Sequence, residues 1–141
     1  MPPQRSSASE RRPLPASGLQ SILIVDDSDG DALLAEMVLT ECVPDATIRH
    51  IDSGQEALDA LEDETFDLIL LDLAMPGLTG FDVLSELKNR PDFATDIVVL
   101  TSSTRPEDRR TILDQGIGFV VKDSDFGSFR FHLAAALPIV S

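Results

Sequence analysis

Tryptophan and tyrosine are absent from this sequence of 141 residues, and cysteine occurs once, as Cys42. A lone cysteine cannot form an intramolecular disulfide, so we expect Cys42 to be a small packed residue, with a reactive thiol as the alternative. The aromatic residues are seven phenylalanines, which predicts a mainly aliphatic core. The length and the 43% hydrophobic content suit one domain with one sizeable core.

Long hydrophobic runs are also lacking. No stretch approaches the roughly 18 consecutive apolar residues of a transmembrane helix, so we expect no membrane association. The first residues, MPPQRSSASERRPLPASG, have no apolar middle of the kind a signal peptide needs, which favours a cytoplasmic protein. Residues 1–20 are rich in proline, serine and arginine without periodicity, and they predict a flexible N-terminal tail.

Basic residues are scarce beyond this tail. The chain has 11 lysines and arginines against 25 aspartates and glutamates, a net charge of −14. The first 20 residues carry +2, so the remaining 121 carry −16. Such a field repels the phosphate backbone and attracts cations, and we therefore expect no nucleic-acid partner.

Between residues 21 and 137, short apolar runs alternate with amphipathic stretches, which predicts five strands and five helices. Ser28 and Ser53 suit the N-caps of the first two helices, and Pro106 suits the first turn of the fourth. The expected strands cover about 22–25, 47–51, 67–72, 97–101 and 117–122. The expected helices cover about 29–42, a stretch after Ser53, 79–89, a stretch from Pro106, and 125–137. The first helix has Leu33, Leu34, Met37 and Val38 on one apolar face.

Strands that are apolar on both faces and alternate with helices predict an α/β fold with a parallel sheet covered on both sides. Right-handed crossovers make this sheet doubly wound. Ligands of such sheets bind at the carboxyl ends of the strands. The informative side chains are therefore those that end strands: Asp26, Asp27, Asp72, Thr101 and Lys122.

Three carboxylates at one edge repel each other unless a cation lies between them. Mg²⁺ prefers oxygen ligands and is usually held by one or two carboxylates together with phosphate oxygens and water. We expect Asp27 and Asp72 to ligate Mg²⁺ directly and Asp26 to hold a bound water. The backbone carbonyl of Ala74 is expected to complete the protein ligands.

The same edge suits phosphoryl chemistry. A carboxylate such as that of Asp72 can attack phosphorus and form an acyl phosphate. This transfer needs positioning and neutralisation of charge more than acid–base chemistry. Lys122 can neutralise a phosphoryl oxygen, Thr101 can donate a hydrogen bond to one, and the small Ser102 leaves room for the group.

Four segments, taken in their order and spacing, resemble the response-regulator receiver family over residues 21–137. The resemblance implies the flavodoxin-like strand order 2-1-3-4-5, Asp72 as the phosphorylated residue and a sensor histidine kinase as the phosphoryl donor. The segments are ILIVDD at 22–27, LLDLAMPG at 70–77, VLTS at 99–102 and FVVK at 119–122.

The resemblance also assigns roles to the remaining residues of the edge. It implies that Asp26 and Asp27 form the acidic metal pocket and that Lys122 contacts the phosphoryl group. It implies that Thr101 and Phe119 are a switch pair, in which the hydroxyl moves to the phosphoryl group and the ring swings inward. Simple core packing is the alternative for Phe119.

A finer similarity concerns small stand-alone receivers that serve phytochrome-type sensor kinases, and it lies in the segments DSDGD at 27–31, SS at 102–103 and RPED at 105–108. It implies a single-domain signalling protein, not an enzyme, that works by a conformational switch. A phytochrome-type kinase and a homodimer are the expected partners. Residues 138–141 would be a short apolar tail with no output domain after it.

One position departs from the family pattern. Asp123 follows Lys122, where the family usually has a proline in a cis peptide, and a trans bond is expected here because a non-proline cis bond costs about 3 kcal/mol. The added negative charge favours an alternative function, a pseudo-receiver that binds proteins independently of phosphorylation. The intact carboxylates Asp26, Asp27 and Asp72 argue against that alternative.

Overall fold

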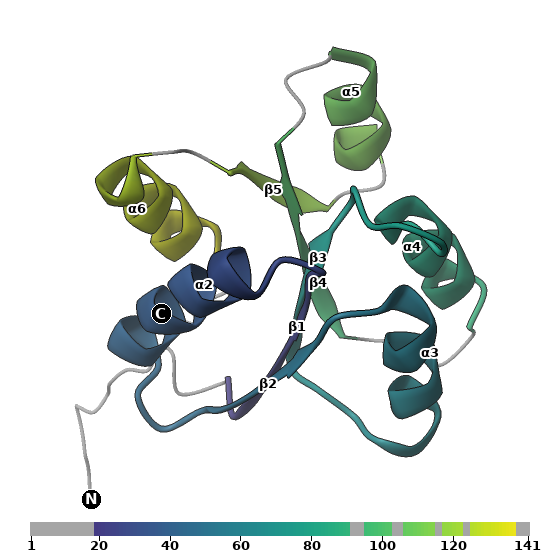
Figure 1. Ribbon diagram of the computed structural model, residues 1–141, viewed down its shortest axis with the longest axis horizontal. Helices are drawn as coiled ribbons and strands as arrows, with labels where there is room; N and C mark the ends of the chain where they lie inside the picture. Colours follow the sequence, from purple (N-terminus) through teal and green to yellow (C-terminus); the bar gives the residue numbers. More distant parts are fainter. Residues whose placement is uncertain (1–18, 91–94, 103–105, 115–116, 123–124, 138–141) are drawn as a thin grey trace, which may run out of the picture.

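The computed structural model describes residues 19–90, 95–102, 106–114, 117–122 and 125–137 (Figure 1). The strands are β1 (Ser21–Val25), β2 (Thr47–Ile51), β3 (Leu68–Asp72), β4 (Asp96–Thr101) and β5 (Gly118–Val121). The helices are α2 (Asp29–Cys42), α3 (Gly54–Asp63), α4 (Gly80–Lys88), α5 (Pro106–Asp114) and α6 (Phe126–Ala136). These elements confirm the predicted alternation of strands and helices.

The five strands form one parallel sheet in the order β2-β1-β3-β4-β5, which confirms the predicted doubly wound α/β fold. The central strand, β3, is buried along its whole length. Its sequence, LILLD, is apolar on both faces because helices cover both sides of the sheet.

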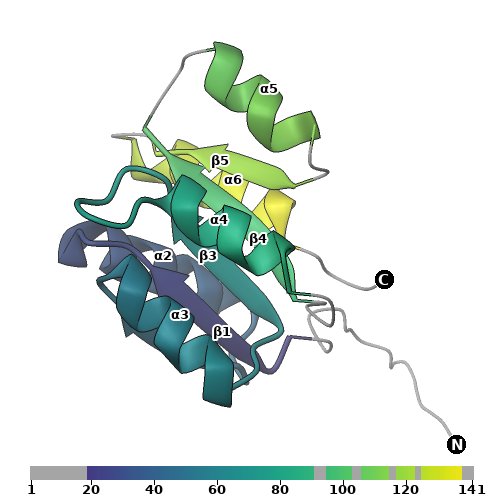
Figure 2. The same ribbon diagram turned by 90° about the vertical axis from the view of Figure 1, so that its right-hand side faces the viewer.

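Helices cover the two faces unequally. Figure 1 shows α2 and α6 on one face of the sheet and α3, α4 and α5 on the other, and Figure 2 shows α3 and α4 in front of the strands. Alternate residues of β1 therefore enter different cores: Ile22 and Ile24 face α2 and α6, whereas Leu23 and Val25 face α3 and α4. Among the described helices, none is long and apolar enough to span a bilayer.

The prediction of which face of α2 is buried is wrong. Val38 is buried, but Leu33 is 58% exposed, Leu34 36% and Met37 49%. The buried stripe is instead formed by small or β-branched residues with a leucine, namely Ala32, Ala35, Val38 and Leu39. Apolar residues surround most of this helix, so periodicity did not select a face; close packing against the sheet and α6 places the alanines inward.

The helix starts follow the sequence closely. Ser28 and Ser53 cap α2 and α3 as predicted, and each side chain accepts a hydrogen bond from a backbone N–H in the first turn. Before β1, Leu19 is buried and the Gln20 N–H donates to the Asp67 carboxylate, so both belong to the folded part, two residues before the expected boundary. Residues 1–18 of the N-terminal tail predicted at 1–20, and the predicted tail at 138–141, lie outside the described residues.

A close contact fixes α4 next to the end of β3. The Gly80 N–H donates to the Leu73 carbonyl oxygen at 3.1 Å. A Cβ atom at Gly80 would lie 2.2 Å from the carbonyl oxygen of Asp72 and 2.6 Å from the Cα of Leu73. Glycine is therefore required here by space, because the backbone that follows Asp72 passes directly against the helix start.

Candidate functional site

The sheet register brings the predicted residues to one edge. Val25 pairs with Leu71, so Asp26 follows β1 at the level of Asp72, the last residue of β3. Across the next two strands, Asp72 pairs with Leu100 and Thr101 pairs with Val121. Asp26, Asp27, Asp72, Thr101 and Lys122 therefore all lie at the carboxyl ends of their strands, as predicted.

Three carboxylates at this edge form a compact cluster. Asp26, Asp27 and Asp72 each offer an oxygen atom, and these atoms lie within 4.8 Å of one another. Asp26 and Asp72 are buried, at 0% and 3% exposure, whereas Asp27 is exposed. Within the described parts of the chain, Asp26 Oδ2 accepts no hydrogen bond of good geometry, and its cationic neighbour is the Lys122 ammonium group. A buried anionic oxygen beside two other carboxylates fits a hard divalent cation.

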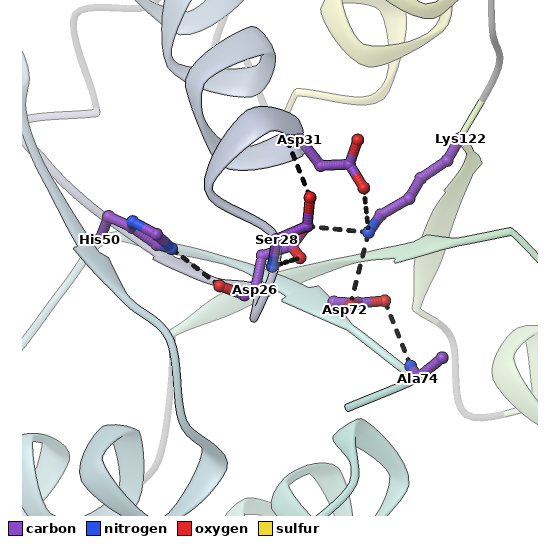
Figure 3. A network of polar contacts seen from close by, with 7 residues as sticks. All are labelled: Asp26, Ser28, Asp31, His50, Asp72, Ala74 and Lys122. Atoms are coloured by element: carbon purple, nitrogen blue, oxygen red, sulfur yellow. Dashed lines mark hydrogen bonds and ion pairs between the residues drawn. The ribbon is translucent and has the colours of Figure 1, made fainter. Parts of the chain in front are cut away.

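Backbone groups orient the two buried carboxylates. Asp26 Oδ1 accepts the Ser28 N–H at 2.9 Å, and Asp72 Oδ1 accepts the Ala74 N–H at 3.2 Å. The second oxygen of each carboxylate is thereby left facing Lys122 (Figure 3). The Ala74 backbone carbonyl as a cation ligand stays a prediction.

His50 supports the backbone at Asp26 through a contact that the sequence did not predict. Its Nε2 lies 2.8 Å from the carbonyl oxygen of Asp26, and since a carbonyl only accepts, the ring nitrogen donates (Figure 3). Local sequence carried no signal for this contact, because it depends on the parallel pairing of β1 and β2, in which His50 stands opposite Ile24. His50 therefore holds the backbone of a cluster carboxylate in place.

Lys122 is the cationic centre of the site. Its Nζ lies 2.9 Å from Asp26 Oδ2, 3.0 Å from Asp31 Oδ2 and 3.4 Å from Asp72 Oδ2 (Figure 3). Burial by itself lowers the pKa of Lys122, but the contacts with Asp26 and Asp31 and the charge of Asp72 outweigh it, so the pKa is above its usual value. The contact with Asp31, a residue in the first turn of α2, was not anticipated from the sequence.

Asp72 has a strongly perturbed acidity. Burial, followed by the charge of Asp26, raises the pKa of Asp72 from 3.8 to about 6, against opposing effects of Lys122 and the Ala74 N–H. In the absence of a cation, this carboxylate therefore keeps its proton up to a higher pH than an ordinary aspartate does. A perturbed carboxylate at the ligand-binding edge of a sheet is typical of a functional group.

The expected switch residues share one face of the sheet. Thr101 is buried at the end of β4, and its carbonyl oxygen accepts the Lys122 N–H at 2.7 Å. Phe119, on the neighbouring β5, is half-buried against the core on the α3 and α4 side. The remaining predicted features at Ser103 and Asp123 lie outside the described residues.

Comparison with known proteins decides the family. Residues 22–133 match the family model described as the response regulator receiver domain. The chain belongs to the response regulator receiver domain family. The receiver domain fold is thus confirmed by sequence over nearly all of the described chain.

Individual relatives agree with this family. The receiver domain is 34% identical over 117 residues to YkoG of Bacillus subtilis (strain 168), an uncharacterized transcriptional regulatory protein, covering 82% of this chain and 50% of that protein. It spans about half or less of the length of the curated relatives it matches.

Solved structures give the same result. The phosphorylated cyanobacterial phytochrome response regulator RcpA has a TM-score of 0.75 and 25% identity, over 83% of this chain and 90% of that one. The Mn²⁺-bound form of response regulator Rcp1 has a TM-score of 0.74 and 27% identity, over 82% and 90%. The receiver domain is therefore similar in fold to phytochrome response regulators.

Proposed function

We propose that this receiver domain accepts a phosphoryl group from a sensor histidine kinase on Asp72, with the help of Mg²⁺. The observation that carries the proposal is the position of Asp72 Oδ2, which shares a buried edge with Asp26 and faces the Lys122 ammonium group. Membership of the receiver family, and the likeness to a transcriptional regulatory protein, CiaR of Streptococcus pneumoniae, support the same function.

The chemistry follows from the side chains present. An oxygen of the ionised Asp72 attacks phosphorus, the bond from phosphorus to the donor's leaving group breaks, and an acyl phosphate forms on Asp72. Lys122, 3.4 Å from Asp72 Oδ2, is close enough to pair with a phosphoryl oxygen after transfer. Thr101, at the end of β4, is proposed to donate a hydrogen bond from its hydroxyl group to another phosphoryl oxygen. Water later hydrolyses the acyl phosphate and restores the carboxylate.

The cation would be held by Asp26, Asp27 and Asp72, whose oxygens already lie within 4.8 Å of one another. When bound, it neutralises the clustered carboxylates and the charge on the phosphoryl oxygens. The likeness to response regulator Rcp1, which has been solved in a Mn²⁺-bound form, supports the use of a divalent cation. Ala74 is proposed to add its backbone carbonyl.

Signalling is proposed to use Thr101 and Phe119. A new charge on Asp72 would draw the hydroxyl of Thr101 and change the packing of Phe119 on the neighbouring strand, which alters the surface next to α5 and α6. The similarity to RcpA favours a phytochrome-type kinase as partner. A homodimer and a cytoplasmic location complete this proposal, in which the chain is a phosphoacceptor and not an enzyme.

The test is intact mass after incubation with acetyl phosphate, with and without Mg²⁺. We expect the mass of one phosphoryl group to be added only with Mg²⁺, and to be lost in Asp72→Asn. The matched control is Asp45→Asn, an exposed aspartate far from the site in the turn before β2, which should be labelled like the wild type.

Two outcomes contradict the proposal. Stoichiometric labelling of Asp72→Asn would show that the acceptor is another residue. No labelling of the wild type, either by acetyl phosphate or by a purified phytochrome-type histidine kinase, would favour the pseudo-receiver, a binding module that does not use phosphate.

A further inference from the structure

Lys122 is held by one carboxylate that does not belong to the cation cluster. Asp31 Oδ2 lies 3.0 Å from Lys122 Nζ, whereas the cluster consists of Asp26, Asp27 and Asp72. The two partners are 91 residues apart in the sequence, and the contact joins the first turn of α2 to the end of β5 (Figure 3).

We propose that Asp31 is a positioning residue that anchors the Lys122 ammonium group outside the cation cluster, so that cation binding does not displace it from the acceptor carboxylate. This inference rests on the proposed phosphorylation of Asp72, which it deepens by adding a residue that acts through Lys122.

The need for such an anchor follows from competition. Lys122 contacts the Oδ2 atoms of Asp26 and Asp72. The carboxylates of these two residues also belong to the cluster that would bind a divalent cation. A divalent cation outcompetes a single ammonium group for shared oxygens, and two cations at one oxygen repel each other. Without another partner, Lys122 would either leave the site when the divalent cation binds or stay there and weaken the binding of that cation.

Asp31 is well placed to be that partner. Its side chain is 45% exposed and keeps contact with water, so it avoids most of the desolvation that the buried Asp26 undergoes. It lies in the first turn of α2, where the helix dipole favours a negative charge. Its backbone is fixed by the Ser28 cap, which accepts the Asp31 N–H at 3.3 Å.

The surroundings strengthen the ion pair. Lys122 is only 17% exposed, and it lines a hollow between α2 and α6 together with Asp31. The other walls of this hollow are the apolar side chains of Leu34, Leu100 and Phe129. An ion pair beside apolar walls is screened less than one in open solvent. Anchored there, Nζ remains within a short side-chain movement of Asp72.

The test compares Asp31→Asn with Asp29→Asn. Both variants remove one acidic charge from the first turn of α2, but only Asp31 contacts Lys122. The first readout is the affinity for Mn²⁺ without any phosphoryl donor, measured by electron paramagnetic resonance of the free ion. The second is the rate of labelling by acetyl phosphate at saturating Mg²⁺.

We expect Asp31→Asn to weaken Mn²⁺ binding about fivefold and to lower the saturated labelling rate about fivefold, with changes below about twofold in Asp29→Asn. The first effect arises because Lys122 then competes fully for the cluster, and the second because Lys122 has lost its anchor. In a Lys122→Met background, Asp31→Asn should weaken Mn²⁺ binding no more than Asp29→Asn does.

Three results would overturn the proposal. The first is equal behaviour of Asp31→Asn and Asp29→Asn in both readouts. The second is an undiminished effect of Asp31→Asn in the Lys122→Met background, which would show that Asp31 does not act through Lys122. The third is tighter Mn²⁺ binding in Asp31→Asn. Because Mn²⁺ affinity needs no phosphoryl donor, a wild type that binds Mn²⁺ but is never labelled would reject the proposed function and still leave the anchor testable.

Discussion

Removing the negative charge of Asp72 should stabilise the cation-free protein. The reason is that burial and the charge of Asp26 raise the pKa of Asp72 from 3.8 to about 6 in the folded state. Ionising this carboxylate in the fold therefore costs free energy that the unfolded chain does not pay. Asp72→Asn keeps the size of the side chain and abolishes that cost.

The magnitude and its pH dependence follow from the two pKa values. One pKa unit corresponds to about 1.4 kcal/mol, so ionisation at neutral pH destabilises the cation-free fold by at most about 3 kcal/mol. Between pH 3.8 and about 6 the folded state binds more protons than the unfolded state, and the free energy of unfolding falls as the pH rises through this window. Below it both states are protonated and the penalty vanishes.

We therefore expect Asp72→Asn to raise the free energy of unfolding by about 1–3 kcal/mol at pH 7.5 in EDTA, and to leave it nearly unchanged near pH 4. Urea unfolding followed by far-UV circular dichroism is the suitable assay, because the chain has no tryptophan or tyrosine to report by fluorescence. Asp45→Asn, an exposed control, should show no such pH-dependent difference.

Saturating Mg²⁺ should reverse the order of stability. A ligand that binds only the folded state stabilises it in proportion to the logarithm of its concentration over its dissociation constant. In the proposed site, the wild type would bind Mg²⁺ with one more carboxylate than the variant. A gain from Asp72→Asn that is absent at pH 7.5, or that has the same size at pH 4, would refute the account of Asp72 as a buried, cation-dependent carboxylate.

Four further substitutions probe how the fold supports the site. Gly80→Ala should lower the free energy of unfolding by about 2 kcal/mol or more, because its Cβ would lie 2.2 Å from the Asp72 carbonyl oxygen. Gly30→Ala should be neutral or slightly stabilising, because nothing lies within 4 Å of the added Cβ. The midpoints of urea unfolding compare the two variants. Leu70→Ala, in the fully buried central strand, should cost about 2–5 kcal/mol in the same assay. Arg130→Gln, which breaks an exposed ion pair between α6 and α2, should leave the midpoint unchanged, and a clear loss would contradict the weak role assigned to surface pairs.

Much of the architecture was predictable because it depends on local patterns. Runs such as LILLD in β3 are apolar on both faces, which predicts a buried parallel strand. Ser28 and Ser53 cap their helices because a serine at a helix start is favoured by local hydrogen bonding alone. Since parallel strands end at one edge, the strand-ending Asp26 and Asp72 were predicted to meet there.

Other features depended on contacts that no local pattern specifies. The rotation of α2, which exposes Leu33 and buries Ala35, is set by how closely the helix packs on the sheet and on α6. The contact between Asp31 and Lys122 joins residues 91 positions apart, so only the tertiary fold brings them together.

The sequence by itself therefore determined the order of strands and helices and the chemistry available at the carboxyl edge, because periodicity, capping and strand ends are local properties. The tertiary structure decided which face of α2 is buried and which carboxylates share Lys122. It also decided that the start of α4 lies against the backbone of Asp72, which is possible because Gly80 has no Cβ atom. These depend on packing distances and on side chains from distant segments, which become defined only when the helices are placed on the sheet.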